Sequence, residues 1–164
     1  MQSGGIAAAG GCLQAGRKGL NTPSMSDLPP YAHLLQLRTE QQEDGSLLFS
    51  MPFHDDVVGR PEYLHGGAIA GLLEFAAYAT LRRALDEAGV TLKPITVTID
   101  YMLGGKDRET YASAVIERLG RSVANVEAFA WQADRKRPIA SARINFLLDR
   151  GKPLPLGGAI GTAD

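Results

Sequence analysis

Four runs in the second half of the chain alternate between apolar and polar side chains, which is the pattern of β-strands. They cover residues 95–102, 108–119, 122–132 and 138–148. In the last run, five apolar residues share one face: Ala140, Ala142, Ile144, Phe146 and Leu148. The short connections predict an antiparallel meander with one covered face.

One long apolar segment precedes these strands. From Gly66 to Leu81 the only charged side chain is Glu74, and the apolar character continues to Gly89, a suitable C-terminal cap. The pattern predicts a helix of about 22 residues. Because its first turns are apolar nearly all round, we expect this helix to be buried.

The segment before the long helix predicts three smaller features. Residues 30–37 predict a short helix that starts at Pro29 and Pro30. Residues 37–52 predict a hairpin whose turn lies at residues 43–46. Residues 53–63 contain Gly and Pro and predict a loop.

A hairpin, a long helix and a meander together predict a sheet wrapped around a helix. Small residues on the sheet's inner face, among them Ala124, Ala128 and Ala130, leave room for a helix to lie close. This is the hot-dog arrangement, an α+β fold, and we assign it to residues 28–150. The Gly-, Ala- and Ser-rich residues 1–27 are expected to form a disordered leader, and residues 151–164 a flexible tail.

Composition excludes several classes of protein. A net charge of −1 gives no reason to expect nucleic-acid or anionic-membrane binding. No run approaches the roughly 20 apolar residues of a membrane span. Cys12 is the only cysteine and the chain has three histidines, so we expect neither an internal disulfide nor a metal site. These features favour a cytoplasmic protein.

A His65-Gly66-Gly67 triplet stands at the start of the long predicted helix. It places two backbone N–H groups without side chains at a helix N-terminus, where negative charge on an oxygen is favoured. This is the description of an oxyanion hole for acyl transfer. The alternative is a glycine turn that is required only for packing.

Glu74 is a carboxylate in the middle of the apolar helix. The positions three and four residues away hold Ala70, Gly71, Ala77 and Tyr78, so no basic partner lies on the same helix. One interpretation is an ion pair with an arginine of the sheet, Arg118 or Arg143. The other is a general base or nucleophile that acts on an acyl carbon.

The spacing between these two features limits how they cooperate. Gly67 and Glu74 are seven residues apart, or about 10.5 Å along a helix axis. A carboxylate at that distance cannot attack a carbonyl held at the N-terminus of its own helix. If both serve one reaction, they come from two subunits with antiparallel helices about a two-fold axis. The sequence therefore predicts a homodimer with composite sites.

From Pro30 to Leu148 the chain resembles the hot-dog-fold acyl-CoA thioesterases, specifically the PaaI-like group. The resemblance is carried by LHGGAIAGLLEFAA, TVTIDYM and IERLGRSVANVEAFA, and by the nine-residue spacing from His65 to Glu74. It implies that the Gly66 amide, with Gly67 nearby, polarises a thioester carbonyl. It also implies that the partner subunit's Glu74 activates water or attacks directly. His65 then shapes the loop, although it is also a candidate catalytic base. No cofactor is implied, since coenzyme A is part of the substrate.

Two positions depart from the family pattern. Gly59, beside Arg60, stands where many members carry Asn or Gln, and Pro94 stands where many carry Ser or Thr. The hairpin end around Gly120 is a candidate site for CoA phosphates, with a solvated turn as the alternative. The full set of predicted substrate-binding residues is Gly59, Arg60, Tyr78, Thr96, Thr98, Arg118, Gly120, Arg121 and Ser122.

The predicted function is hydrolysis of an aryl or medium-chain acyl-CoA by a homodimer or a dimer of dimers. The predicted acyl tunnel is lined by Leu72, Phe75, Tyr78 and Tyr101. Two alternatives remain open. His54 keeps open a dehydratase or hydratase of hydroxyacyl thioesters, although the His-Phe-Pro-Gly signature of that class is absent. The departures at Gly59 and Pro94 suggest a non-catalytic acyl-CoA-binding protein.

Overall fold

The computed structural model describes residues 29–85, 87 and 89–151. The predicted leader, residues 1–27, and the predicted tail from residue 152 onward lie outside the described residues, as does Cys12.

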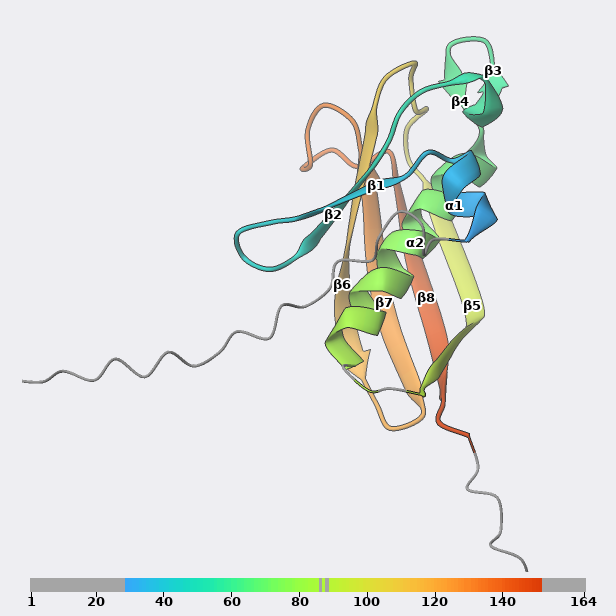
Figure 1. Cartoon of the computed structure of the whole chain (residues 1–164). Coiled ribbons are helices and arrows are strands. Elements are labelled where there is room, and N and C mark those ends of the chain that lie inside the picture. Colours follow the sequence, from blue (N-terminus) through green and yellow to red (C-terminus); the bar gives the residue numbers. More distant parts are fainter. Residues whose placement is uncertain (1–28, 86, 88, 152–164) are drawn as a thin grey trace, which may run out of the picture.

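The described chain forms one six-stranded antiparallel sheet, a long helix and a small two-stranded hairpin (Figure 1). The helices are α1 (Pro30–Leu34), the 3-10 turn η2 (Asp55–Val57) and α2 (Gly66–Leu85). The strands of the large sheet are β1 (Arg38–Gln41), β2 (Leu47–Met51), β5 (Thr91–Tyr101), β6 (Thr110–Leu119), β7 (Val123–Trp131) and β8 (Ala140–Asp149). The small hairpin pairs β3 (Val58–Arg60) with β4 (Tyr63–Leu64).

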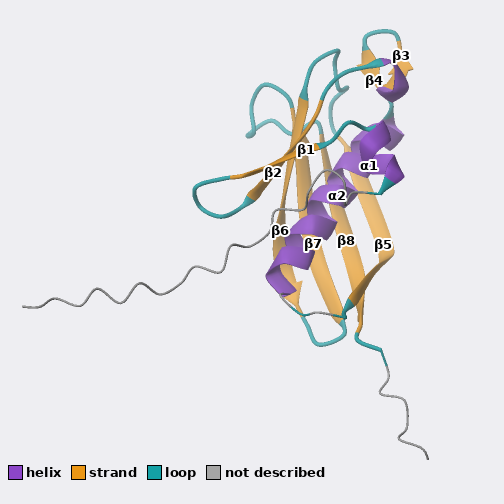
Figure 2. Cartoon of the chain, viewed as in Figure 1, coloured by secondary structure: helices purple, strands orange, loops and turns teal. Residues whose placement is uncertain are grey.

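Helix α2 lies across one face of the large sheet (Figure 2). Leu72, Leu73 and Ala76 of α2 are fully buried, as are Ala124, Ala128 and Ala130 of β7. The five apolar residues predicted to share one face of β8 are all buried. The absence of long side chains on the inner face of β7 lets the helix approach closely. The predicted hot-dog fold is confirmed.

The strand order is β1-β2-β6-β7-β8-β5. The predicted meander is therefore wrong for β5, which does not lie next to β6. Strand β5 pairs with β8 and forms the far edge, because residues 102–109 carry the chain back across the sheet to β6. Strand β5 also begins at Thr91, before the predicted start at residue 95. A register shift between Pro94 and Thr96 interrupts the alternation of apolar and polar residues. The first residues of the strand, from Thr91, therefore do not continue the pattern that starts at Ile95.

Helix α2 is 20 residues long and is not covered on all sides. Glu74 and Tyr78 are exposed, and with the half-buried Gly67 and Ala70 they form a stripe, spaced by three or four residues, that the sheet does not fully cover. The prediction that the whole helix is buried is therefore wrong for the single chain. The larger aliphatic residues, such as Leu72 and Leu73, face the sheet, whereas the stripe combines the small residues Gly67 and Ala70 with Glu74 and Tyr78.

The segment before α2 differs from the prediction in two places. Helix α1 stops at Leu34, short of the predicted Leu37, because Gln36 adopts a left-handed φ of 52°. The predicted hairpin is confirmed, and its Gly45 has a φ of 85° in the turn between β1 and β2. The predicted loop of residues 53–63 contains η2 and the β3–β4 hairpin. This hairpin lies at the N-terminal end of α2 (Figure 1).

Candidate active site

The N-terminus of α2 is capped by the preceding histidine. The His65 carbonyl accepts the N–H of Ala68, and His65 Nδ1 accepts the N–H of Gly67 at 2.9 Å. The Gly66 N–H has no acceptor among the described residues. One amide, rather than the two expected, is therefore free to bind an oxyanion. The bond to Gly67 also agrees with a shaping role for His65.

Two tyrosines fix the first residues of this helix. Tyr101 Oη donates to the carbonyl oxygen of Gly66 at 2.9 Å, and Tyr31 Oη donates to that of Gly67 at 3.2 Å. Tyr101 ends β5 and Tyr31 lies on α1, so both the sheet and the first helix position the His-Gly-Gly turn.

A pocket of about 330 Å³ opens beside Gly66. Its lining is mostly apolar and consists of Leu64, Gly66, Ile69, Tyr101, Met102, Leu103, Gly104 and Gly105. A Cβ atom on Gly66 would lie 3.4 Å from the Tyr101 ring, which also lines the pocket. The missing side chain therefore leaves room for a ligand next to the free amide.

The structure brings only one of the four residues predicted to line an acyl tunnel to this pocket. Tyr101 lines the pocket, but Leu72 is fully buried in the core against the sheet. Phe75 packs against Tyr31, with ring centroids 6.3 Å apart, and Tyr78 packs against Phe146 at 6.4 Å. Sequence reasoning missed Met102 and Leu103. The Gly104-Gly105 pair after β5 is the signal that marks this turn.

Glu74 projects from the exposed stripe of α2. Neither Arg118 nor Arg143 pairs with it, and Arg143 pairs instead with Asp100 at 3.3 Å. No described residue forms an ion pair or hydrogen bond with the Glu74 carboxylate. The structural interpretation, an ion pair with the sheet, is therefore wrong. Two helical turns separate Gly67 from Glu74 on one face, so the axial separation predicted from the sequence is present in the structure.

Gly59 has a steric rather than a chemical reason to be glycine. A Cβ atom at this position would lie 2.7 Å from the Cα of His65. The hairpin backbone therefore lies directly against the residue that caps α2, and His65 N–H also donates to the carbonyl of Val57 at 2.8 Å. An Asn or Gln does not fit here without displacing His65.

The substitution Gly59→Asn should therefore damage both folding and activity. A Cβ forced against backbone should lower the melting temperature by several degrees, in the range of overpacking substitutions. Movement of His65 should lower the rate of the reaction in parallel. The matched control is Gly45→Asn, because Gly45 has open space around it and Asn tolerates its positive φ. Equal melting temperatures of Gly59→Asn and the unmodified protein would contradict the steric reason.

Two predicted binding residues lie on the wrong face of the sheet. Thr96 pairs with Asn145 and Thr98 pairs with Arg143. These partners alternate with Ile144 and Phe146, which are fully buried beneath α2. Thr96 and Thr98 therefore point away from the helix side and do not reach Gly66 of their own chain. They were chosen only as the hydroxyl residues nearest to Pro94, without regard to the face of the strand.

The predicted phosphate-binding turn lies at the other end of α2. Arg150 donates to the carbonyl of Arg121 and pairs with Glu87 at 3.0 Å, and Glu87 follows the C-terminus of α2. The length of α2 therefore separates this turn from Gly66 of the same chain by about 28 Å. Arg118 and Arg121 are exposed. Gly120 donates its N–H to Val123 as part of the turn, and Ser122 accepts a backbone bond from Leu148.

A cationic cluster, which we define as Arg60, Tyr63 and Lys106, lies beside the pocket. Lys106 Nζ donates to Tyr63 Oη at 2.5 Å, and this bond holds the pKa of the Tyr63 phenol below its usual range. The Arg60 guanidinium lies 4.1 Å from the centre of the Tyr63 ring. Arg60 was predicted as a binding residue, whereas Tyr63 and Lys106 were missed. Their contact spans 43 residues of sequence, so no local spacing indicates it.

Comparisons with known proteins agree with this geometry. Residues 62–139 match the family model of the thioesterase superfamily. A protein from Chromobacterium violaceum is 33% identical, with a TM-score of 0.64 over 77% of this chain and 88% of that one. The BH2602 protein from Bacillus halodurans, solved with CoA, is 24% identical, with a TM-score of 0.70 over 76% and 82% of the two chains. A Staphylococcus aureus thioesterase enzyme is 24% identical, with a TM-score of 0.65 over 72% and 97%.

No curated protein matches the chain significantly. Among the described residues, no helix has the length and apolar character needed to cross a bilayer. The matched family segment contains the capped N-terminus of α2, Glu74 and the pocket. The chain belongs to the thioesterase superfamily and has its hot-dog fold.

Proposed function

We propose that this protein hydrolyses acyl-CoA thioesters with aryl or medium-chain acyl groups. The observation that carries the proposal is the free Gly66 amide at the start of α2, next to an apolar pocket of about 330 Å³. A thioester carbonyl that accepts this N–H develops negative charge where the helix N-terminus stabilises it. The pocket beside it suits an apolar acyl group.

The second catalytic group comes from another copy of the chain. Strand β5 is a long edge strand whose outer side pairs with no strand of the described residues, and it exposes Ile95, Val97 and Tyr101 at 56%, 42% and 54%. The opposite edge, β1, has only four residues and carries Arg38 and Glu40. Long apolar edges invite pairing, whereas short charged edges resist it. We therefore assign β5 to the dimer interface. A further pairing into a dimer of dimers stays a prediction.

The exposed stripe of α2 fits the same two-fold arrangement. Ala70 lies midway between Gly66 and Glu74 along the helix. If two α2 helices cross antiparallel at Ala70, each Gly66 faces the partner subunit's Glu74. A small residue at the crossing point permits close approach. In such a dimer each Glu74 lies beside the thioester bound at Gly66 of the partner subunit, whereas it is too far from Gly66 of its own chain.

In this site the Gly66 amide and the partner subunit's Glu74 together account for thioester hydrolysis. The partner subunit's Glu74 accepts a proton from water, and the water oxygen attacks the thioester carbon. Negative charge moves to the carbonyl oxygen at the Gly66 amide, the C–S bond then breaks, and the thiolate of CoA leaves with a proton. Direct attack by the carboxylate would instead form an anhydride, which water then hydrolyses.

The test is a panel of acyl-CoA thioesters assayed for release of free thiol. Thiol release supports hydrolysis. Release of an enoyl-CoA from a 3-hydroxyacyl-CoA, without free thiol, would instead support the dehydratase alternative. His54 Nε2 is buried without a partner, but its Nδ1 lies 3.7 Å from Asp56, outside the pocket lining. Tight binding without either product would indicate a non-catalytic acyl-CoA-binding protein.

The phosphates of CoA are expected to contact Arg118 and Arg121. In the antiparallel dimer, the turn that holds them extends past the Gly66 end of the other chain's helix. Arg121→Ala should raise the KM for an acyl-CoA about tenfold, because charge-assisted contacts to phosphate are lost. It should hardly change hydrolysis of the same acyl group on pantetheine, which has no nucleotide. Equal losses on both substrates would show that the arginine is structural.

A further inference from the structure

The cationic cluster is held in place by several independent contacts. Both Arg60 and Lys106 lie over the ring of Tyr63, at 4.1 and 4.0 Å from its centre. The Gln132 side chain accepts the N–H of Lys106 and donates to its carbonyl, both at 2.9 Å. Gly104 lies against the Tyr63 ring, where a Cβ atom would be 2.8 Å away. The two cations are therefore positioned by the fold.

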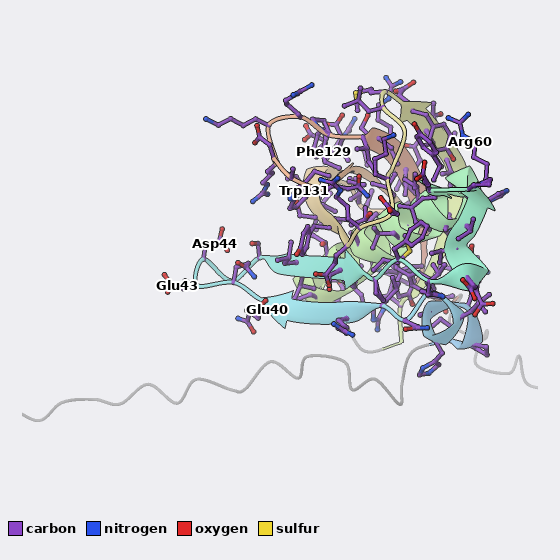
Figure 3. All side chains as sticks on the ribbon, turned by 90° about the horizontal axis from the view of Figure 1, so that it is seen from above. Glu40, Glu43, Asp44, Arg60, Phe129 and Trp131 are labelled. Atoms are coloured by element: carbon purple, nitrogen blue, oxygen red, sulfur yellow. The ribbon has the colours of Figure 1, made fainter. Side chains whose placement is uncertain are left out.

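No ion pair among the described residues neutralises the charges of this cluster, although the nearby Glu62 carboxylate partly opposes the lowering of the Tyr63 pKa. Neither Arg60 nor Lys106 forms an ion pair with a described carboxylate, and both are exposed. Since each lies close to the same ring, the two positive groups are within roughly 8 Å of each other, where like charges repel. Figure 3 shows Arg60 on the far side of the molecule from the acidic turn at Glu43 and Asp44. An anion that contacts both cations at the edge of the Tyr63 ring would offset this repulsion.

The cluster borders the pocket that opens beside Gly66. Tyr63 immediately precedes Leu64, and Lys106 immediately follows Gly105, and both of these neighbours line the pocket. The Leu64 N–H donates to the Gly105 carbonyl at 3.0 Å, which ties the two segments together. Because Lys106 donates to Tyr63 Oη, the phenolic proton of Tyr63 can point toward a further acceptor.

We propose that Arg60 and Lys106, held beside Tyr63, bind an anionic oxygen group of the thioester substrate at the rim of the pocket. This inference rests on the proposed function, since it concerns the same substrate. Two sources carry such a group: a carboxylate at the end of the acyl chain, or a phosphate of CoA. Arg, Lys and a phenolic hydroxyl supply charge-assisted and neutral hydrogen bonds to either one.

The experiment measures dissociation constants of thioether analogues, which cannot be hydrolysed. The three analogues mimic glutaryl-CoA, pentanoyl-CoA and pentanoyl-pantetheine, and calorimetry compares them on Lys106→Met, Arg60→Met and the unmodified protein. If the anion is the acyl carboxylate, each variant weakens the glutaryl analogue about tenfold and leaves both pentanoyl analogues unchanged. If the anion is a phosphate, each variant weakens both CoA analogues about tenfold and leaves the pantetheine analogue unchanged.

The matched control is Lys93→Met, which removes an exposed lysine that pairs with Asp149, outside the cluster. It should leave all three dissociation constants unchanged. Unchanged binding of every analogue to the Lys106 and Arg60 variants, or equal weakening by the Lys93 variant, would overturn the proposal. Hydrolysis of pentanoyl-CoA by the unmodified protein is measured separately, so a failure of the proposed function is distinguished from a failure of this site.

Discussion

Replacement of Glu74 by alanine should lower kcat for thioester hydrolysis by at least about 100-fold, the usual effect of losing an acid–base group. The same substitution should leave the melting temperature unchanged or raise it. Glu74 is exposed in its own chain and has no partner among the described residues, so its removal breaks no contact within the fold. Steady-state kinetics and thermal unfolding on the same preparation measure both effects.

The control for this prediction is Glu43→Ala. Glu43 is an exposed carboxylate in the β1–β2 turn, and its loss should change neither kcat nor the melting temperature. Glu74→Gln should be as slow as Glu74→Ala, because the amide keeps the shape of the side chain but cannot accept a proton. A Glu74→Ala protein with nearly full kcat would remove Glu74 from the mechanism.

The substitution Val97→Lys should convert the proposed dimer into monomers and reduce hydrolysis by a factor similar to that of Glu74→Ala. Val97 is 42% exposed on β5, the edge strand of the described sheet, and pairing of two such edges would bring two lysines close together near the proposed two-fold axis. Since a single chain holds Gly66 and Glu74 too far apart for one reaction, a folded monomer should be inactive. Light scattering measures the mass, and circular dichroism shows that the monomer is folded.

Val123→Lys is the matched control for this substitution. Val123 is 37% exposed on β7, between two neighbouring strands and away from the β5 edge. This variant should remain dimeric and active. A Val97→Lys monomer that retains full activity would contradict the composite site.

The sequence was sufficient to predict those parts of the fold that depend on local periodicity. The buried face of β8 and the small residues of β7 follow from period-2 alternation, and both are confirmed. The neighbour of β5 was predicted wrongly, because strand order depends on which edge a connecting segment reaches, and alternation does not contain that information. The burial of α2 was overestimated because short residues on its open stripe look the same in a sequence as residues under a sheet.

For the candidate site, the sequence predicted the triplet at residues 65–67 and its distance from Glu74, because both lie on one helix. It did not predict that Gly67 is already bonded to His65, since that depends on the rotamer of one side chain. The family resemblance placed Thr96 and Thr98 near the site, although the alternation of β5 puts them on the face opposite Val97 and Ile99, away from α2. The contact between Tyr63 and Lys106 requires the tertiary fold itself.

The most direct test of the composite site is subunit mixing. Glu74→Ala and Gly66→Val are each expected to be inactive, the second because its side chain fills the space beside the Gly66 amide. When equal amounts are unfolded together and refolded, half of the dimers should be mixed, and each mixed dimer should hold one intact site of two. Activity should therefore return to about a quarter of that of the unmodified protein, while each variant refolded alone stays inactive. If mixed dimers form and activity stays at the level of the parents, Gly66 and Glu74 do not act together across the two-fold axis.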